Sequence, residues 1–160
     1  MNQLWLAPHG LHIELATTKD ADAIAKLHAL GFRHGWSRED FASYILSAHE
    51  TPVYIACDAR HRIAGFLMLR LAADEAELIT VAVDPRSRKK GIGAALLKAA
   101  LDDLTRTPAR RLFLEVAADN LAALHLYGKH GFAKISERQG YYPRPDGQPA
   151  TAIVMARDLG

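Results

Sequence analysis

Four cations lie close together in the sequence, at Arg86 and at residues 88–90, and Gly91, Ile92 and Gly93 follow them. A strand-like run precedes this loop and a helix-forming tract follows it. The first N–H groups of a helix have no partner within the helix, and the helix dipole favours negative charge at that end. The loop therefore predicts an anion-binding site. The alternative is a solvated basic turn that caps a surface helix.

The spacing of the glycines excludes two familiar classes of phosphate-binding motif. A dinucleotide-binding fingerprint requires a third glycine three residues after Gly93, where Leu96 stands. A P-loop requires the sequence Gly-Lys-Ser/Thr, which this loop lacks. The anion site belongs to neither class.

Three polar residues further along the chain are candidates for chemistry. Glu115 interrupts an apolar strand-like run, which is unfavourable unless the carboxylate is used. Its alternative role is an ion pair with Arg110 or Arg111 at the strand end. Tyr127 occupies a helical tract, where a tyrosine serves either packing or proton transfer. Asn120 stands where that helix begins and suits an N-cap.

Hydrophobic periodicity predicts the elements that position these residues. Alternating apolar residues predict strands over residues 11–17, 52–57, 63–71, 77–83, 110–116, 133–138 and 151–157. Helical spacing predicts helices over residues 17–32, 37–47, 94–104 and 120–130. Ser37 begins a capping box at the start of the second helix. The strands over residues 52–57, 63–71 and 77–83 should form an antiparallel meander. Residues 140–149 read as a loop rich in turn formers and aromatics.

Composition limits the classes of protein that the chain could belong to. A chain of 160 residues with 49% hydrophobic positions predicts one domain over residues 1–160. The single cysteine, Cys57, excludes a disulfide framework, and the eight histidines show no zinc-ligand spacing, so we expect no metal. No signal peptide or membrane span is evident, which favours a cytoplasmic protein. A net charge of +2 does not require a polyanionic partner, and nucleic-acid binding is disfavoured.

The stretch from Arg88 to Gly93 resembles the R-x-x-G-x-G/A pyrophosphate loop of the GNAT acetyltransferases, and the predicted order of elements matches that family. Downstream, LEVAADNLAALHLYGKHGF is similar to a segment of the bacterial ribosomal-protein-alanine acetyltransferases and of their relatives that act on N-terminal amines. HGWS around Trp36 and GYY at residues 140–142 extend the resemblance over most of the chain.

The resemblance implies an α/β GNAT fold, with a mixed sheet of about seven strands, two splayed parallel strands and about four helices. It implies acetyl-CoA as cosubstrate and no metal. Glu115 would be the general base, because an ammonium must lose a proton before it attacks a thioester, and burial raises the pKa of a carboxyl group toward that task. Tyr127 would be the general acid that protonates the departing thiolate.

The resemblance also implies the binding residues. The backbone at Val81 and Val83 and the side chain of Asn120 would contact the pantetheine arm. The pyrophosphate would bind at Arg88, Lys89, Lys90, Gly91, Ile92, Gly93 and Ala94. Trp36, Tyr141 and Tyr142 would flank the acceptor, although aromatics in such loops also serve to pin the loop to the core.

Three positions depart from the ribosomal relatives. Gly35 stands where these have proline, Ala117 where they have arginine, and residues 148–150 where they have an acidic pair. The chemistry therefore carries over better than the ribosomal substrate. We expect acetyl transfer to an amine, with a protein N-terminus, of a ribosomal or another protein, as the favoured acceptor. A lysine or small-molecule acetyltransferase and a non-catalytic CoA-binding regulatory module are the alternatives, and the oligomeric state is not predicted.

Overall fold

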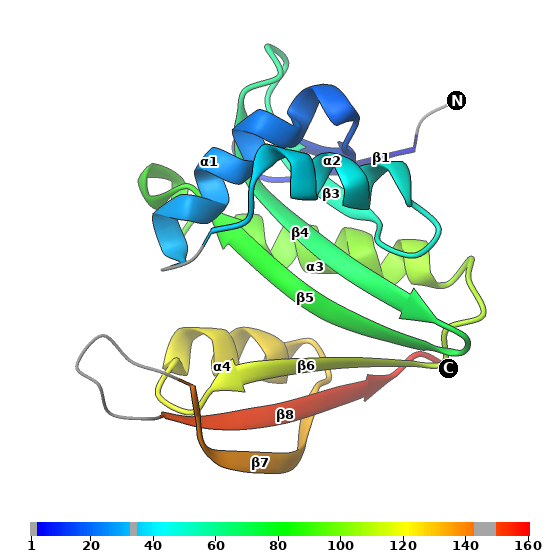
Figure 1. Ribbon diagram of the computed structural model, residues 1–160, viewed down its shortest axis with the longest axis vertical. Helices are drawn as coiled ribbons and strands as arrows, with labels where there is room; N and C mark the ends of the chain where they lie inside the picture. Colours follow the sequence, from blue (N-terminus) through cyan, green and yellow to red (C-terminus); the bar gives the residue numbers. More distant parts are fainter. Residues whose placement is uncertain (1–2, 33–34, 143–149) are drawn as a thin grey trace.

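Eight strands form one mixed sheet in the computed structural model, which describes residues 3–32, 35–142 and 150–160. The strands are β1 (Leu4–Leu6), β2 (His12–Leu15), β3 (Val53–Cys57), β4 (Ile63–Ala72), β5 (Glu75–Val83), β6 (Arg111–Ala117), β7 (Ala133–Tyr142) and β8 (Ala150–Asp158). Their order across the sheet is β1-β2-β3-β4-β5-β6-β8-β7 (Figure 1). Every neighbouring pair is antiparallel except β5 and β6.

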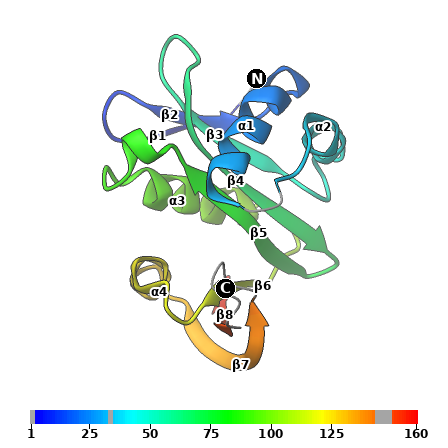
Figure 2. The same ribbon diagram turned by 60° about the vertical axis from the view of Figure 1, so that its left-hand side comes forward.

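Helices cover both faces of the sheet (Figures 1 and 2). The helices are α1 (Ala21–Gly31), α2 (Arg38–Leu46), α3 (Ile92–Leu104) and α4 (Leu121–Lys129), with short 3-10 turns at Thr18–Asp20 and Pro85–Ser87. The α1 and α2 helices pack on one face, while α3 and α4 pack on the other. No helix in the described ranges is long and apolar enough to cross a membrane. The predicted α/β class is confirmed.

The local sequence accounts for the start of α2 at Arg38. The Ser37 hydroxyl accepts a hydrogen bond from the Asp40 N–H, and the Asp40 carboxylate accepts one from the Ser37 N–H. This reciprocal pair satisfies two of the free donors of the first turn, as the predicted capping box requires. Phe41 and Ile45 then turn inward, and both are buried.

Two hydrophobic cores fill the space between the sheet and its helices. On the first face, Ile24 and Leu27 of α1 meet Phe41 of α2 and Phe66 of β4. On the second, α3 packs over β2, β3, β4 and β5 and brings Leu96 and Leu97 onto the sheet. The second core continues under α4, where Leu126 lies next to Gly93 in the first turn of α3.

A β-bulge in β5 opens the sheet between its two parallel strands. The register with β4 pairs Met68 with Thr80 and Leu69 with Leu78, so Ile79 has no partner of its own there. A bulge bends its strand and increases the local twist. The β5–β6 pairing is confined to Glu75–Glu77 against Arg111–Phe113. Beyond it the strands diverge toward their carboxyl ends (Figure 1), which confirms the splayed pair expected from the resemblance.

Two strands differ from the sequence prediction of about seven. β1 is additional, and it is held by Trp5, whose indole N–H donates to Asp102 of α3 at 2.8 Å while its ring packs against Tyr54. β7 runs to Tyr142 rather than ending at Arg138, because Tyr142 pairs with Ala150 after a register shift. Residues 143–149 of the predicted loop lie outside the described ranges.

Candidate active site

A cavity of about 700 Å³ lies where β5 and β6 diverge. The carboxyl end of α1, the end of β5, the loop before α3 and the first turns of α4 line it. Ten of the residues predicted for the cofactor and for acid catalysis share this cavity, namely Val81, Val83, Arg88, Lys89, Gly91, Ile92, Gly93, Ala94, Asn120 and Tyr127. Segments between Leu27 and Tyr127 that are separate in the sequence thus meet in one place, as a single binding site requires.

The loop before α3 presents backbone donors to this cavity. Gly91 is the N-cap of α3 with φ +77°, a conformation that only glycine adopts without strain. Lys89 also has a positive φ, of 64°. The first turn of α3 contains no acidic residue, and no side chain caps it. Its N–H groups and the helix dipole are therefore available to an anion, with the side chains of Arg88 and Lys89 beside them.

The other two cations of the loop do not line the cavity. Arg86 folds back onto Asp84, with Nη2 3.0 Å from Oδ2 and Nε 3.2 Å from Oδ1. The guanidinium lowers the pKa of the Asp84 carboxyl group. Lys90 lines a neighbouring pocket of about 430 Å³ that also contains Asp84 and Arg86. The structure thus separates Lys90 from the other residues predicted to bind the pyrophosphate.

Glu115 lies in a second cleft of about 320 Å³, on the opposite face of β6 from the α3–α4 core. Leu114 and Val116 alternate with it and are buried in that core. The Glu115 carboxylate is 24% exposed, and its Oε1 lies 3.4 Å from Nη1 of Arg138. The sequence suggested Arg110 or Arg111 as the ion-pair partner of Glu115, and this is wrong. The partner is Arg138 of β7, which reaches across β8, whereas Arg111 contacts Asp158.

Tyr127 and Asn120 are both held by α4. Asn120 caps the helix, with its side-chain oxygen accepting a hydrogen bond from the Ala123 N–H at 3.2 Å. Tyr127 is 6% exposed and packs edge-to-face on Phe132, with the ring centroids 5.7 Å apart. Both residues line the large cavity, so the predicted cap is confirmed and packing accounts for part of the role of Tyr127.

The predicted acceptor-side residues are described only in part. Trp36 packs against Phe41 and Tyr44 and stacks on His28, with the His28 and Trp36 centroids 4.9 Å apart. The Trp36 N–H donates to Nδ1 of His28 at 3.2 Å. These contacts fix the start of α2 to α1. The side chains of Tyr141 and Tyr142 lie outside the described part of the chain, and only their backbone, in β7, is described.

Sequence analysis missed Thr80, which follows the bulge in β5. Its side chain is 5% exposed, and within the described ranges its hydroxyl has no hydrogen-bond partner. A buried hydroxyl without a partner is unfavourable and calls for an explanation such as a ligand. Thr80 immediately precedes Val81, which lines the cavity. The signal in the sequence was a polar residue inside the apolar run ELITVAV.

The sequence profile of the acetyltransferase (GNAT) family matches residues 6–132, and the chain belongs to this family. It is an acetyl-CoA-dependent N-acetyltransferase of the α/β class described above.

Particular relatives are similar over most of the chain. The [ribosomal protein bS18]-alanine N-acetyltransferase of Escherichia coli K12 is 34% identical over 139 residues, which cover 87% of this chain and 91% of the relative. Its Salmonella typhimurium counterpart is 33% identical over 144 residues, covering 90% and 95%. The crystal structure of the Escherichia coli ribosomal-protein-S18-alanine N-acetyltransferase superposes with a TM-score of 0.84 at 32% identity and covers 94% of each chain. At 18% identity, Arabidopsis thaliana NAA60 in complex with acetyl-CoA shares the fold with a TM-score of 0.79, covering 92% of this chain and 98% of that one.

Proposed function

We propose that this enzyme acetylates the α-amino group of a protein N-terminus, and that an N-terminal alanine of a ribosomal protein is the first acceptor to test. The observation that carries the proposal is the 34% identity, over 87% of the chain, to enzymes named for that reaction. The match extends beyond the cofactor loop into the strands and the helix that carry Glu115 and Tyr127.

We assign the large cavity between β5 and β6 as the binding site of acetyl-CoA. Its pyrophosphate would bind at the N-terminus of α3, where Arg88 and Lys89 add positive charge. The pantetheine arm would run along the edge of β5 at Val81 and Val83, where the pairing with β6 has ended. Peptide-like amides of a ligand can pair with such an edge as an added strand does.

Acetyl transfer requires one proton to leave the amine and one to reach the sulfur. The amine nitrogen bonds to the acetyl carbon as the carbon–sulfur bond breaks. In our proposal Glu115 takes the amine proton, directly or through a water molecule, and Tyr127 supplies a proton to the thiolate. Glu115 faces one cleft and Tyr127 the other cavity, so the two groups would act from opposite sides of the thioester.

The cleft around Glu115 supports an amine acceptor. Glu75 and Glu77 line it together with Glu115, and Arg70 and Arg138 accompany these carboxylates. Carboxylates attract a protonated amine toward the base. An α-amine, with a pKa of about 7.7–8.0, is neutral far more often near pH 7 than a lysine, with a pKa of about 10.4. One carboxylate base is therefore better suited to the α-amine.

Mass spectrometry of peptides after incubation with labelled acetyl-CoA tests the proposal. One panel has free N-terminal alanine, and a matched panel has a blocked N-terminus and one internal lysine. We expect label on the free α-amine and far less on the lysine. Faster labelling of lysine or of free polyamines would replace the proposal with the lysine or small-molecule alternative. Binding of acetyl-CoA without any labelled product would favour a regulatory module.

Tyr127→Phe tests the acid separately from the base. The substitution keeps the ring that packs on Phe132 but removes the proton. The rate should fall, and it should recover with a CoA analogue whose sulfur is a better leaving group, because that anion needs less help from an acid. A rate defect that the better leaving group does not relieve would leave Tyr127 with a packing role only.

A further inference from the structure

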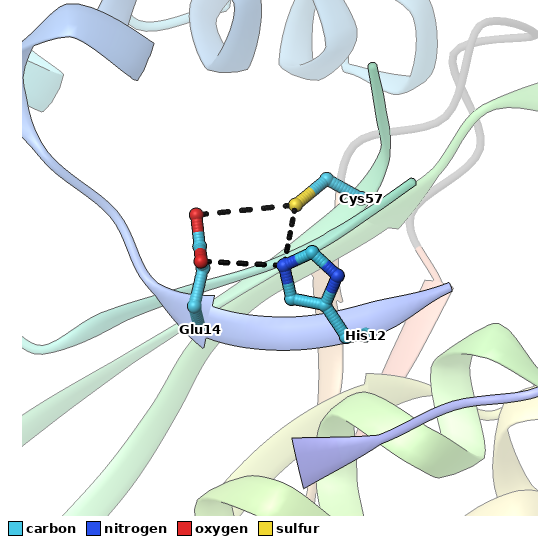
Figure 3. Close-up of side chains that lie close together, drawn as sticks. All are labelled: His12, Glu14 and Cys57. Carbon is cyan, nitrogen blue, oxygen red and sulfur yellow. Dashed lines mark hydrogen bonds and ion pairs between the residues drawn. The ribbon is translucent and has the colours of Figure 1, made fainter. Parts of the chain in front are cut away.

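A group of metal-ligand side chains lies apart from the two cavities of the acetyltransferase site, on the α1 face of the sheet. His12 and Glu14 are two residues apart on β2 and therefore share a face of that strand. Cys57, at the end of β3, is the cross-strand partner of His12. Figure 3 shows the three side chains converging on one point.

Two of the three separations between the donor groups lie close to the edges of a tetrahedral site, and the third is longer. His12 Nε2 lies 3.4 Å from Cys57 Sγ and 3.2 Å from Glu14 Oε2, and Cys57 Sγ lies 4.0 Å from Glu14 Oε1. Tetrahedral zinc with Zn–N near 2.0 Å and Zn–S near 2.3 Å places its ligand atoms about 3.3–3.6 Å apart. The three contacts also satisfy hydrogen-bond distances. The spacing is therefore compatible with an ion between the three side chains once the Glu14 carboxylate moves slightly toward the thiol.

His61 lies beside this group of three but is not part of it. Its Nδ1 is 3.4 Å from Glu14 Oε1 and 3.9 Å from Cys57 Sγ. Its Nε2 is 2.7 Å from Oδ1 of Asp20, which is 4% exposed. A neutral imidazole that donates its Nε2–H to this carboxylate presents the Nδ1 lone pair to the cluster. A histidine oriented by a buried carboxylate in this way is typical of metal ligands in proteins.

The charge of the cluster favours a cation. Glu14 and Asp20 bring two carboxylates to the histidines and to the thiol, whereas the nearby Asp58 already has Arg62 at 2.7 Å. Two imidazoles, a sulfur and a carboxylate are a donor set that suits zinc. The side chains of His12 and Glu14 are 30% and 23% exposed, so an ion can reach the site without unfolding of the chain.

We propose that this chain binds one Zn²⁺ through His12 Nε2, the Glu14 carboxylate and Cys57 Sγ, and that His61 Nδ1 moves toward the ion to become the fourth ligand. Binding forms the Zn–S bond as the S–H bond of Cys57 breaks, and the proton passes to solvent. With four protein ligands the site is structural. It would join β2 and β3 to the turn before β4 and, through Asp20, to the start of α1.

No pattern in the sequence indicates this site, because its ligands do not follow the spacing of zinc-binding loops. Positions 12, 14, 57 and 61 are brought together by the pairing of β2 with β3 and by the turn after β3. Only the register of the two strands places His12 opposite Cys57.

Cobalt substitution tests the proposal directly. After treatment of the full-length protein with a chelator, Co²⁺ should bind at one equivalent, with a thiolate-to-cobalt charge-transfer band and the visible bands of tetrahedral cobalt, and Zn²⁺ should abolish both. Cys57 is the only cysteine of the chain, so the charge-transfer band can arise from no other residue. Cys57→Ser should remove the band, and His12→Gln should weaken binding at least tenfold. His125→Gln is the matched control at an exposed histidine and should change neither.

Thermal unfolding gives a second readout. Zn²⁺ at about 100 times its Kd should raise the Tm of the wild type by roughly 5–10 °C. The shift should vanish in Cys57→Ser, while the Tm shift caused by acetyl-CoA should persist there and show that the variant is folded. Absence of stoichiometric metal binding, cobalt binding without a thiolate band, or an equal zinc shift in the wild type and Cys57→Ser would each overturn the proposal.

Discussion

Glu115→Gln should separate the catalytic role of this residue from its structural one. The substitution keeps the size of the side chain and removes its charge. Glu115 forms an ion pair with Arg138 at 3.4 Å, and the Arg138 side chain is 56% exposed. Because exposed pairs contribute about 0.2–1 kcal/mol, the free energy of unfolding should change by less than about 1 kcal/mol. The corresponding change in Tm is at most about 2–4 °C.

The rate should respond far more strongly than the stability. Loss of a general base lowers kcat by about 10²–10⁴, which equals roughly 2.7–5.4 kcal/mol of transition-state stabilisation. The affinity for acetyl-CoA should remain unchanged, because Glu115 lines the cleft and not the cavity of the phosphate loop. A rate effect several times larger than the stability effect is the signature of a base.

Glu77→Gln is the matched control. Glu77 lines the same cleft and forms an ion pair with Arg70 at 2.7 Å, shorter than that of Glu115. The assay is steady-state release of free CoA with an N-terminal peptide as acceptor, together with denaturant unfolding of both variants. If Glu115→Gln retains wild-type kcat, or if Glu77→Gln loses as much, the assignment of Glu115 as the base is refuted.

Three further variants test the neighbouring parts of the site. Arg88→Glu should weaken acetyl-CoA binding at least tenfold, because Arg88 lines the cavity. Arg86→Glu makes the same change at a side chain that is already paired with Asp84, and it should have much less effect. Equal losses of affinity in the two variants would mean that only the net charge matters. Thr80→Val removes a buried hydroxyl that has no partner in the described ranges, so the free energy of unfolding should stay the same or increase. At the same time kcat/KM should fall about tenfold. Unchanged kinetics would exclude a contact between Thr80 and the ligand. Burial lowers the pKa of His28, so the folded state resists its protonation and loses stability as the pH falls below about 6.5. His28→Asn should flatten that loss in urea unfolding measured across this range, and an unchanged slope would contradict it.

Local sequence patterns predicted the elements whose signals are short-range. The capping box at Ser37 needs only two side chains three residues apart, and the structure contains it. The helix predicted over residues 94–104 is α3, which begins two residues earlier, at Ile92, after the left-handed Gly91. These features depend on neighbours in the chain, so periodicity and turn chemistry could find them.

Features that depend on distant partners were missed or misassigned. β1 contains only three residues and rests on the contact of Trp5 with Asp102, 97 positions away. The ion-pair partner of Glu115 was sought beside it in sequence, whereas Arg138 comes from β7, across one intervening strand. The donor set around Cys57 requires the β2–β3 register. None of these pairings leaves a pattern within a short window of sequence.

The brevity of the β5–β6 ladder has a consequence for amide hydrogen exchange. Only three residue pairs, Glu75–Glu77 with Arg111–Phe113, join the two parallel strands, so the amides of β5 that face the gap beyond them are not protected by β6. Local exchange at such positions does not require global unfolding. A pantetheine arm lying in the gap would slow exchange there, while the amides of β5 that face β4 should keep their protection with or without ligand. Along one strand, alternate residues would thus report on cofactor occupancy and on the stability of the fold.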